Sequence, residues 1–169
     1  VAVIGEGTLL ESWQGEGSRN ASAKCLEQLI SWDVDLNVVT GFIADVEPGS
    51  FTGVRVGVML AKTLGWAHKC PVAGISSFDL ISFHEVVSLP GRRGEWLVRE
   101  PSGPVSVASE FRGLGYGTGT ERRDYPNASA AVNLIPFMNW VPAIELLPEY
   151  HLAPSISTPK TPYRAEAPP

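Results

Sequence analysis

The sequence predicts an α/β fold in which an antiparallel hairpin is followed by parallel strands and crossover helices. Strand-like and helix-like segments alternate through the first half of the 169-residue chain in the order ββαβαβα, which is typical of a sheet with crossover helices. The 14 prolines are the second observation, because only Pro48 and Pro71 fall within residues 1–89. Proline breaks helices and cannot donate to a central ladder, so long regular elements are expected in that part of the chain.

The chain is expected to open with a hairpin. Val1–Ile4 is a short apolar strand, a Gly-Glu-Gly turn follows, and Thr8–Gln14 is the returning strand. Next comes a helix over residues 20–32, with Asn20 or Ser22 as its candidate cap. Helical spacing places four residues on one apolar face of it: Cys25, Leu26, Leu29 and Ile30.

A strand, a long helix and another strand follow. Val38–Ala44 is an apolar strand candidate, and after a Pro-Gly-Ser turn a helix is predicted from Thr52, its candidate cap, to about His68. Val72–Ile75 predicts the next strand and Ser76–Phe83 the next helix. The long helix carries small residues four apart, which allow close packing on the sheet, on a neighbouring helix or on another subunit: Gly53, Gly57, Ala61 and Gly65.

The proline-rich remainder predicts a different organisation. All other prolines lie in residues 90–169, so short strands, turns and extended segments are expected there. We therefore divide the chain into an N-terminal α/β lobe (1–89), a short turn-rich second lobe (90–150) and a proline-rich C-terminal tail with little structure of its own (151–169).

Charge and cysteine content limit the classes of function. The net charge of −5 argues against a protein that binds nucleic acid alone, because such proteins present a basic face to the phosphates. The adjacent basic pairs Arg92–Arg93 and Arg122–Arg123 are interpreted as solvated loop residues. No apolar run approaches the roughly 18 residues of a membrane span. Cys25 and Cys70 lie far apart and lack CxxC spacing, so no disulfide framework or zinc cluster is expected. They are interpreted as thiols in a reducing compartment.

Several catalytic motifs fail on their spacing. The glycines of a Walker loop are missing before Lys62, and the alternating glycines of residues 113–119 do not match a dinucleotide-binding loop. The nucleophile elbow GxSxG is absent. His68, His84 and His151 show neither HxxxH nor HExxH spacing. The sequence therefore shows none of these catalytic motifs and no visible metal site.

The most specific segment is Glu47-Pro-Gly-Ser-Phe-Thr-Gly-Val-Arg-Val-Gly-Val. Its composition suits a turn from a strand into a helix, since Gly49 tolerates positive φ and the hydroxyls of Ser50 and Thr52 can accept from unpaired N–H groups. Exposed amides at a helix start also suit an anion. A helix cap and a phosphate-facing loop are the two interpretations.

This segment resembles the signature of the TsaB family, also called YeaZ, which is roughly GPGSFTGxRxG. The resemblance continues in Leu60-Ala-Lys-Thr-Leu, in Pro71-Val-Ala-Gly-Ile-Ser-Ser and in Gly91-Arg-Arg-Gly-Glu, and it ends in Leu147-Pro-Glu-Tyr and in Pro154-Ser-Ile-Ser-Thr-Pro-Lys. It touches most of residues 1–160. The signature-loop residues in this chain are Pro48, Gly49, Ser50, Phe51, Thr52, Gly53 and Arg55.

The resemblance implies an actin/hexokinase-like ATPase (ribonuclease H-like) fold and a cytoplasmic, non-catalytic subunit. TsaB proteins are partners of TsaD, which transfers a threonylcarbamoyl group to the tRNA adenosine beside the anticodon, and TsaE joins the same bacterial complex. ATP and metal are then handled by the partner subunits, and tRNA is met only indirectly. The helices over 20–32 and 52–68 match the TsaD-binding surface, through which TsaB also self-associates. This implies a partner interface at Cys25, Leu26, Leu29, Ile30, Gly53, Gly57, Ala61 and Gly65.

Two departures from the family pattern stand out. Glu47 replaces the first glycine of the signature, and a carboxylate there would repel a phosphate. Family members also open with a central strand resembling LLAIDTS, which is missing ahead of Val1, so we expect a fragment or a misplaced start. The alternative functions are a small phosphotransferase of the same fold, which would need paired phosphate loops and a catalytic aspartate, and a metallo-glycoprotease-like protein, which would need a histidine pair absent from residues 19–30.

Overall fold

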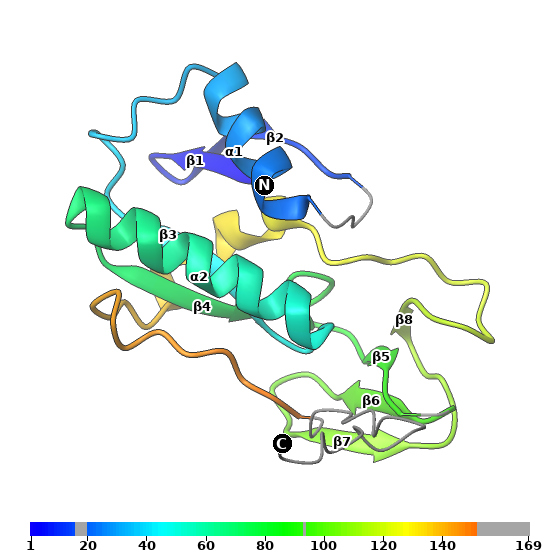
Figure 1. The fold of residues 1–169 in the computed structure, drawn as a ribbon. Coiled ribbons are helices and arrows are strands. Elements are labelled where there is room, and N and C mark those ends of the chain that lie inside the picture. The colour runs from blue at the N-terminus through cyan, green and yellow to red at the C-terminus, as the bar shows by residue number, and fades with distance from the viewer. Residues whose placement is uncertain (16–19, 93, 152–169) are drawn as a thin grey trace, which may run out of the picture.

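The computed structural model describes residues 1–15, 20–92 and 94–151. Within these residues the strands form two sheets of two strands and one sheet of four, and the α-helices lie in the first half of the chain (Figure 1). Both parallel and antiparallel pairs are present. The predicted mixed α/β class is therefore confirmed.

The predicted hairpin is present at the N-terminus. Strands β1 (Ala2–Gly5) and β2 (Thr8–Ser12) pair antiparallel. Glu6 and Gly7 both have positive φ, at 51° and 74°, as a tight two-residue hairpin turn requires. Beyond the strands, the Val1 ammonium donates to the Trp13 carbonyl at 2.8 Å, and the Trp13 N–H donates back to Val1. These bonds extend the pairing to the first residue of the chain.

Helix α1 (Ala21–Ser31) occupies the predicted position but leaves part of its apolar face uncovered. Asn20 is the N-cap residue, although its side chain makes no capping hydrogen bond. Leu29 is half-buried, whereas Leu26 is 37% exposed and Ile30 is 77% exposed. The helix was predicted correctly. Part of its apolar face is not covered by other described residues of the chain.

A parallel strand pair and the long helix between them form the centre of the first half. Strands β3 (Phe42–Glu47) and β4 (Val72–Ser76) pair in parallel and are connected by α2 (Phe51–His68). The strand predicted at 38–44 was wrong in its bounds: residues 38–41 lie outside any strand, and Val38 is 73% exposed. Ser50, rather than Thr52, caps α2.

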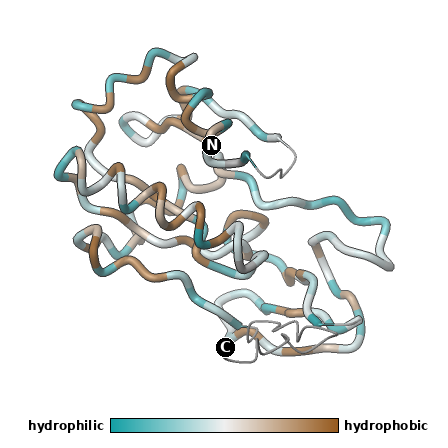
Figure 2. Tube along the Cα trace, viewed as in Figure 1, coloured by the Kyte–Doolittle hydropathy of each residue, from teal (hydrophilic) through white to brown (hydrophobic). Residues whose placement is uncertain are grey.

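Helix α2 packs on β3 and β4 with its small-residue side. Val54, Val58 and Ala61 are buried against Ala44, Val46 and Val72 in one apolar cluster. Figure 2 shows apolar residues along the whole length of α2, with more polar residues between them. A Cβ on Gly65 would lie 2.5 Å from Val72 Cγ1, so the helix end approaches β4 more closely than a larger residue allows.

Replacing Gly65 by alanine is therefore expected to lower the free energy of unfolding by about 1–2 kcal/mol, because overpacking outweighs the better helix propensity of alanine. Gly57→Ala is the matched control on the same helix: its Cβ would have only an ordinary 4.0 Å contact with the Asp45 carbonyl oxygen, so stability should rise by up to about 1 kcal/mol. Urea denaturation measures both. Equal changes in the two variants would contradict the close approach at Gly65.

The helix predicted at 76–83 is wrong. Residues 77–81 form successive hydrogen-bonded turns, in which Leu80 N–H donates to Ser76 and Ser82 N–H donates to Phe78. The chain then enters the four-stranded sheet, whose order is β7-β6-β5-β8. Its strands are β5 (Val87–Pro90), β6 (Trp96–Arg99), β7 (Val105–Ala108) and β8 (Leu114–Gly115).

Phe78 joins these turns to the four-stranded sheet. It is fully buried in a cluster with Val87, Leu89 and Leu97, and the Arg99 guanidinium lies 5.2 Å from the centre of its ring. Arg99 also pairs with the Asp79 carboxylate at 2.5 Å. The turn after β4 is thus anchored by one aromatic side chain and one ion pair.

The chain after the four-stranded sheet returns to the first half. The short 3₁₀ helices η1 (Ala128–Asn133) and η2 (Ile135–Phe137) lie near the hairpin, and Ala131 shares a cluster with Ile75 and Leu80. Val141 bridges to Val72 at the edge of β4. The segment that follows, residues 140–151, is called the C-terminal segment below.

Within the described residues, β1 and β3 each have a single partner strand. A central strand between them, as the resemblance implies, stays a prediction, and so does the division into lobes and tail. The tail predicted at 151–169 lies, beyond its first residue, outside the described residues. Searched over the described part of the chain, none of the helices has the length and apolar content needed to cross a membrane.

Candidate functional site at the carboxyl ends of β3 and β4

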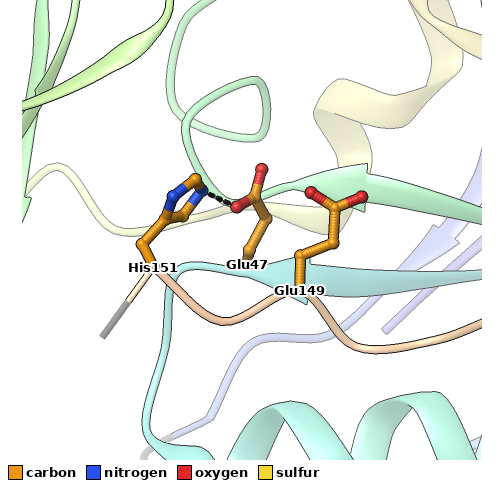
Figure 3. A group of neighbouring side chains, drawn as sticks. All are labelled: Glu47, Glu149 and His151. Atoms are coloured by element: carbon orange, nitrogen blue, oxygen red, sulfur yellow. Dashed lines mark ion pairs between the residues drawn. The ribbon is translucent and has the colours of Figure 1, made fainter. Parts of the chain in front are cut away.

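Polar side chains gather where β3 and β4 end. Asp45 and Glu47 belong to the last residues of β3, Ser77 directly follows β4, and Glu149 and His151 come from the C-terminal segment (Figure 3). The carboxyl ends of parallel strands meet at one edge of a sheet, and ligands of α/β proteins bind outside this edge. This is the place in the fold where a functional site is expected.

Asp45 is held by two hydrogen bonds in a largely buried position. The Ser77 hydroxyl donates to its Oδ2 at 2.5 Å, and the Glu47 N–H donates to its Oδ1 at 3.1 Å. Burial raises the pKa of Asp45 to about 6, against the lowering effect of these two donors. The carboxyl group therefore changes charge near neutral pH.

Glu47 points toward the C-terminal segment. Its carboxylate forms an ion pair with the His151 imidazole, and its carbonyl oxygen accepts from the Ser77 N–H. Burial raises the pKa of Glu47, and the negative charges of Glu149 and Asp45 raise it further, while His151 and Arg99 lower it. Of the groups that stabilise the charged form of Glu47, the His151 side chain therefore contributes most, against the repulsion from the neighbouring carboxylates.

The signature loop beside Glu47 is a helix cap. The Gly53 N–H donates to the Ser50 Oγ at 3.0 Å, and the Ser50 φ and ψ of −61° and 136° are those of an extended residue before a helix. Pro48 is buried, and Gly49 allows close approach, since a Cβ there would lie 2.8 Å from Val54 Cγ2. The structure thus supports the interpretation as a helix cap over that as a phosphate-facing loop. The side chain of Phe51 lies outside the described residues.

The residues predicted as a partner interface separate into two groups. On α1, Cys25 and Leu29 are half-buried and Leu26 and Ile30 are exposed, so that helix keeps an accessible apolar face. On α2, Ala61 is 5% exposed and Gly65 lies against Val72 and the Cys70 carbonyl oxygen. Ala61 and Gly65 are therefore buried within this chain, whereas Gly53 is exposed and Gly57 is half-buried.

Sequence reasoning missed the exposed apolar residues of α2. Met59 is 58% exposed and Trp66 is 79% exposed, and the two lie seven residues apart on the same helix. Residues separated by seven share one helical face, so this spacing was the available signal. It was hidden because the apolar residues of α2 surround the helix almost completely.

Lys62 has a structural role that its position in the failed Walker motif did not indicate. Its Nζ donates to the carbonyl oxygens of Ile144 at 3.0 Å and Leu146 at 2.9 Å. Leu146 is buried in the cluster under α2. Lys62 thus ties the C-terminal segment to α2.

Comparisons with known proteins find similarity to proteins of tRNA threonylcarbamoyladenosine biosynthesis. A family described as "TsaD: tRNA N6-adenosine threonylcarbamoyltransferase" matches residues 18–92. The tRNA threonylcarbamoyladenosine biosynthesis protein TsaB of Bacillus subtilis (strain 168) is 29% identical over 86 residues, covering 48% of this chain and 38% of that protein. The chain therefore spans well under half the length of this curated relative in the match.

Two solved structures share the fold. A crystal structure from Pseudomonas aeruginosa, described as an uncharacterized protein with similarity to peptidase YEAZ, superposes with a TM-score of 0.68 at 21% identity. YeaZ from Pseudomonas aeruginosa superposes with a TM-score of 0.64 at 22% identity. Each match covers 88% of this chain and 92% of the other. These likenesses show that the arrangement of strands and helices described above is shared.

Proposed function

Since these comparisons identify the chain as a relative of TsaB, also called YeaZ, we propose that it serves the biosynthesis of threonylcarbamoyladenosine in tRNA as a non-catalytic subunit that binds TsaD. The sequence match to TsaB of Bacillus subtilis carries this proposal. The family match over residues 18–92 adds to it, because that stretch contains α1, β3, α2 and β4. We further propose a cytoplasmic location and TsaE as a second partner.

The geometry of the signature loop supports a role without phosphate chemistry. The Ser50 hydroxyl already accepts a hydrogen bond as the cap of α2. The Glu47 carboxylate stands at the start of the loop, where its negative charge would repel a phosphate group. Transfer of the threonylcarbamoyl group, with its ATP and metal, is accordingly assigned to the partner subunits, which also contact the tRNA.

The outer faces of α1 and α2 suit the contact with TsaD. Leu26 and Ile30 of α1 and Met59 and Trp66 of α2 are exposed apolar side chains on two helices that contact each other. Exposed apolar patches mark protein–protein interfaces, and Trp and Met are enriched in them. We place the interface on this exposed side, with Cys25 and Leu29 at its border, whereas Gly53, Gly57, Ala61 and Gly65 act by setting the position of α2. A homodimer would use the same side.

Trp66→Glu is expected to weaken binding to TsaD by about 2 kcal/mol, or roughly 30-fold, because a central aromatic contact is lost and a charge is introduced. Phe137→Glu is the matched control, since Phe137 is 84% exposed but lies on η2. The measurement is co-purification of this chain with TsaD from the same organism, followed by titration of the complex.

A tRNA modification assay tests the function itself. With TsaD and TsaE present, modification is expected to depend on this chain and to fall in the Trp66→Glu variant but not in Phe137→Glu. Undiminished modification when the chain is left out would defeat the proposal. Equal binding by both variants would reject the location of the interface and leave the function standing.

A further inference from the structure

Three metal-binding side chains converge beside β3, although their positions in the sequence gave no metal motif. Glu47, Glu149 and His151 each offer one ligand atom, and these atoms all lie within 4.8 Å of one another. Figure 3 shows the His151 ring directed at the Glu47 carboxylate, with the Glu149 side chain projecting next to it. The group combines one imidazole nitrogen with two carboxylates from separate parts of the chain.

The Glu47 carboxylate is incompletely satisfied by the protein. Its side chain is 12% exposed, and its Oε2 atom is buried without a hydrogen bond of regular geometry, having only the ion-pair contact to His151. Buried carboxylates are normally hydrogen-bonded or bound to a metal, because an uncompensated buried charge is costly. An additional positive partner at this atom would remove that cost.

The charges around the group also favour a cation. The Glu47 and Glu149 carboxylates lie within 4.8 Å of each other, and the Asp45 carboxylate, two residues earlier on β3, accepts the Glu47 N–H. Arg99 is the nearby cationic side chain, but its guanidinium is paired with Asp79 at 2.5 Å and lies over the Phe78 ring. Among the described residues, the basic side chain in contact with the Glu47 carboxylate is His151, which carries a positive charge only when it is protonated.

We propose that Glu47, Glu149 and His151 bind a divalent first-row transition cation such as Zn²⁺ at the carboxyl end of β3. Imidazole nitrogen with carboxylate oxygens is a donor set that suits Zn²⁺, whereas Mg²⁺ prefers oxygen ligands alone. The His151 imidazole and the Glu47 carboxylate lie against each other, and the exposed Glu149 side chain can approach by rotation. Water completes the coordination.

Such a cation would join β3 to the C-terminal segment. The Glu149 N–H already donates to the Val46 carbonyl oxygen at 3.0 Å, so the backbone holds the segment beside the strand. Two ligands come from that segment and one from β3, and the metal would close the contact between them. The site has a structural role and does not depend on the function proposed above.

Titration of the full chain with Zn²⁺, followed by calorimetry, tests the site. One ion per chain is expected to bind, and Glu47→Gln and His151→Ala are each expected to weaken binding at least about 100-fold. The matched controls are Glu145→Gln and His84→Ala, which remove an exposed carboxylate and an exposed imidazole away from the group and should bind as the wild type does. Mg²⁺ is expected to bind far more weakly than Zn²⁺.

A second measurement separates metal binding from misfolding. Zn²⁺ should raise the thermal midpoint of the wild type and of both controls, but not of Glu47→Gln or His151→Ala, while circular dichroism shows all five proteins folded without metal. The proposal is overturned if the wild type binds no Zn²⁺ more tightly than about 1 mM. Equal affinity of the wild type and the two ligand variants would overturn it as well.

Discussion

Phe78→Ala is expected to lower the free energy of unfolding by about 3–5 kcal/mol, the range for truncating a fully buried phenylalanine. The ring is 0% exposed and fills the space between Val87, Leu89 and Leu97. Its removal also takes away the surface on which the Arg99 guanidinium rests. Since a domain of this size is stabilised by only about 5–15 kcal/mol, much of the chain is expected to unfold at physiological temperature.

Chemical denaturation followed by tryptophan fluorescence measures this loss. Phe137→Ala serves as the control, because Phe137 is 84% exposed and its truncation should change stability by less than about 0.5 kcal/mol. A loss below about 1 kcal/mol in Phe78→Ala would show that the turn after β4 is not anchored through this ring.

Asp45→Asn is expected to stabilise the protein above neutral pH and not below pH 4. The pKa of Asp45 is raised from 3.8 to about 6, so its folded state prefers the neutral carboxyl group. The wild type therefore loses about 2 kcal/mol of stability as the pH rises from 4 to 7, and then stays lower. Asparagine is neutral throughout and keeps a side-chain oxygen for the Ser77 or Glu47 donor.

The difference in unfolding free energy between Asp45→Asn and the wild type should thus change by about 2 kcal/mol between pH 4 and pH 8. Because one hydrogen bond is weakened, the variant is expected to be slightly less stable at pH 4 and about 2 kcal/mol more stable at pH 8. EDTA in every sample keeps the nearby carboxylates free of cations. A constant difference across this range would mean that Asp45 titrates near its ordinary pKa in the folded protein.

The long regular elements were predictable because their residues carry local signals. Helix α2 has helical periodicity and hydroxyl residues at its start, and β4 is an apolar run after a proline. The hairpin followed from the Gly-Glu-Gly turn, at which Glu6 and Gly7 adopt positive φ. In each case the chemistry that determines the element lies within a few residues of it.

The errors arose where tertiary contacts outweigh local propensity. Val38 and Val39 favour a strand, yet the strand begins at Phe42, where pairing with Val72 becomes available. Residues 76–83 have helical spacing, but burial of Phe78 and the Arg99–Asp79 ion pair hold them as turns. Propensity alone cannot weigh these distant partners.

The cluster of Glu47, Glu149 and His151 at the end of β3 could not be predicted from the sequence, because it also depends on contacts between distant residues. Glu47 and His151 are more than a hundred positions apart, and Glu47 was interpreted only as an unusual residue of the signature loop. The resemblance to TsaB indicated the fold and the helices of the proposed interface. It gave no indication that Lys62 or His151 contacts another part of this chain.

The C-terminal segment has a consequence for biosynthesis of the protein on the ribosome. Val141 pairs with β4, Leu146 fills the cluster beneath α2, and the Glu149 N–H binds Val46. The elements formed by the first 76 residues are therefore synthesised long before the residues that complete their packing. Translation adds only about 5–20 residues per second, so the nascent chain would spend several seconds with this surface uncovered. A chaperone could bind this uncovered surface until the C-terminal segment emerges from the ribosome and packs on it.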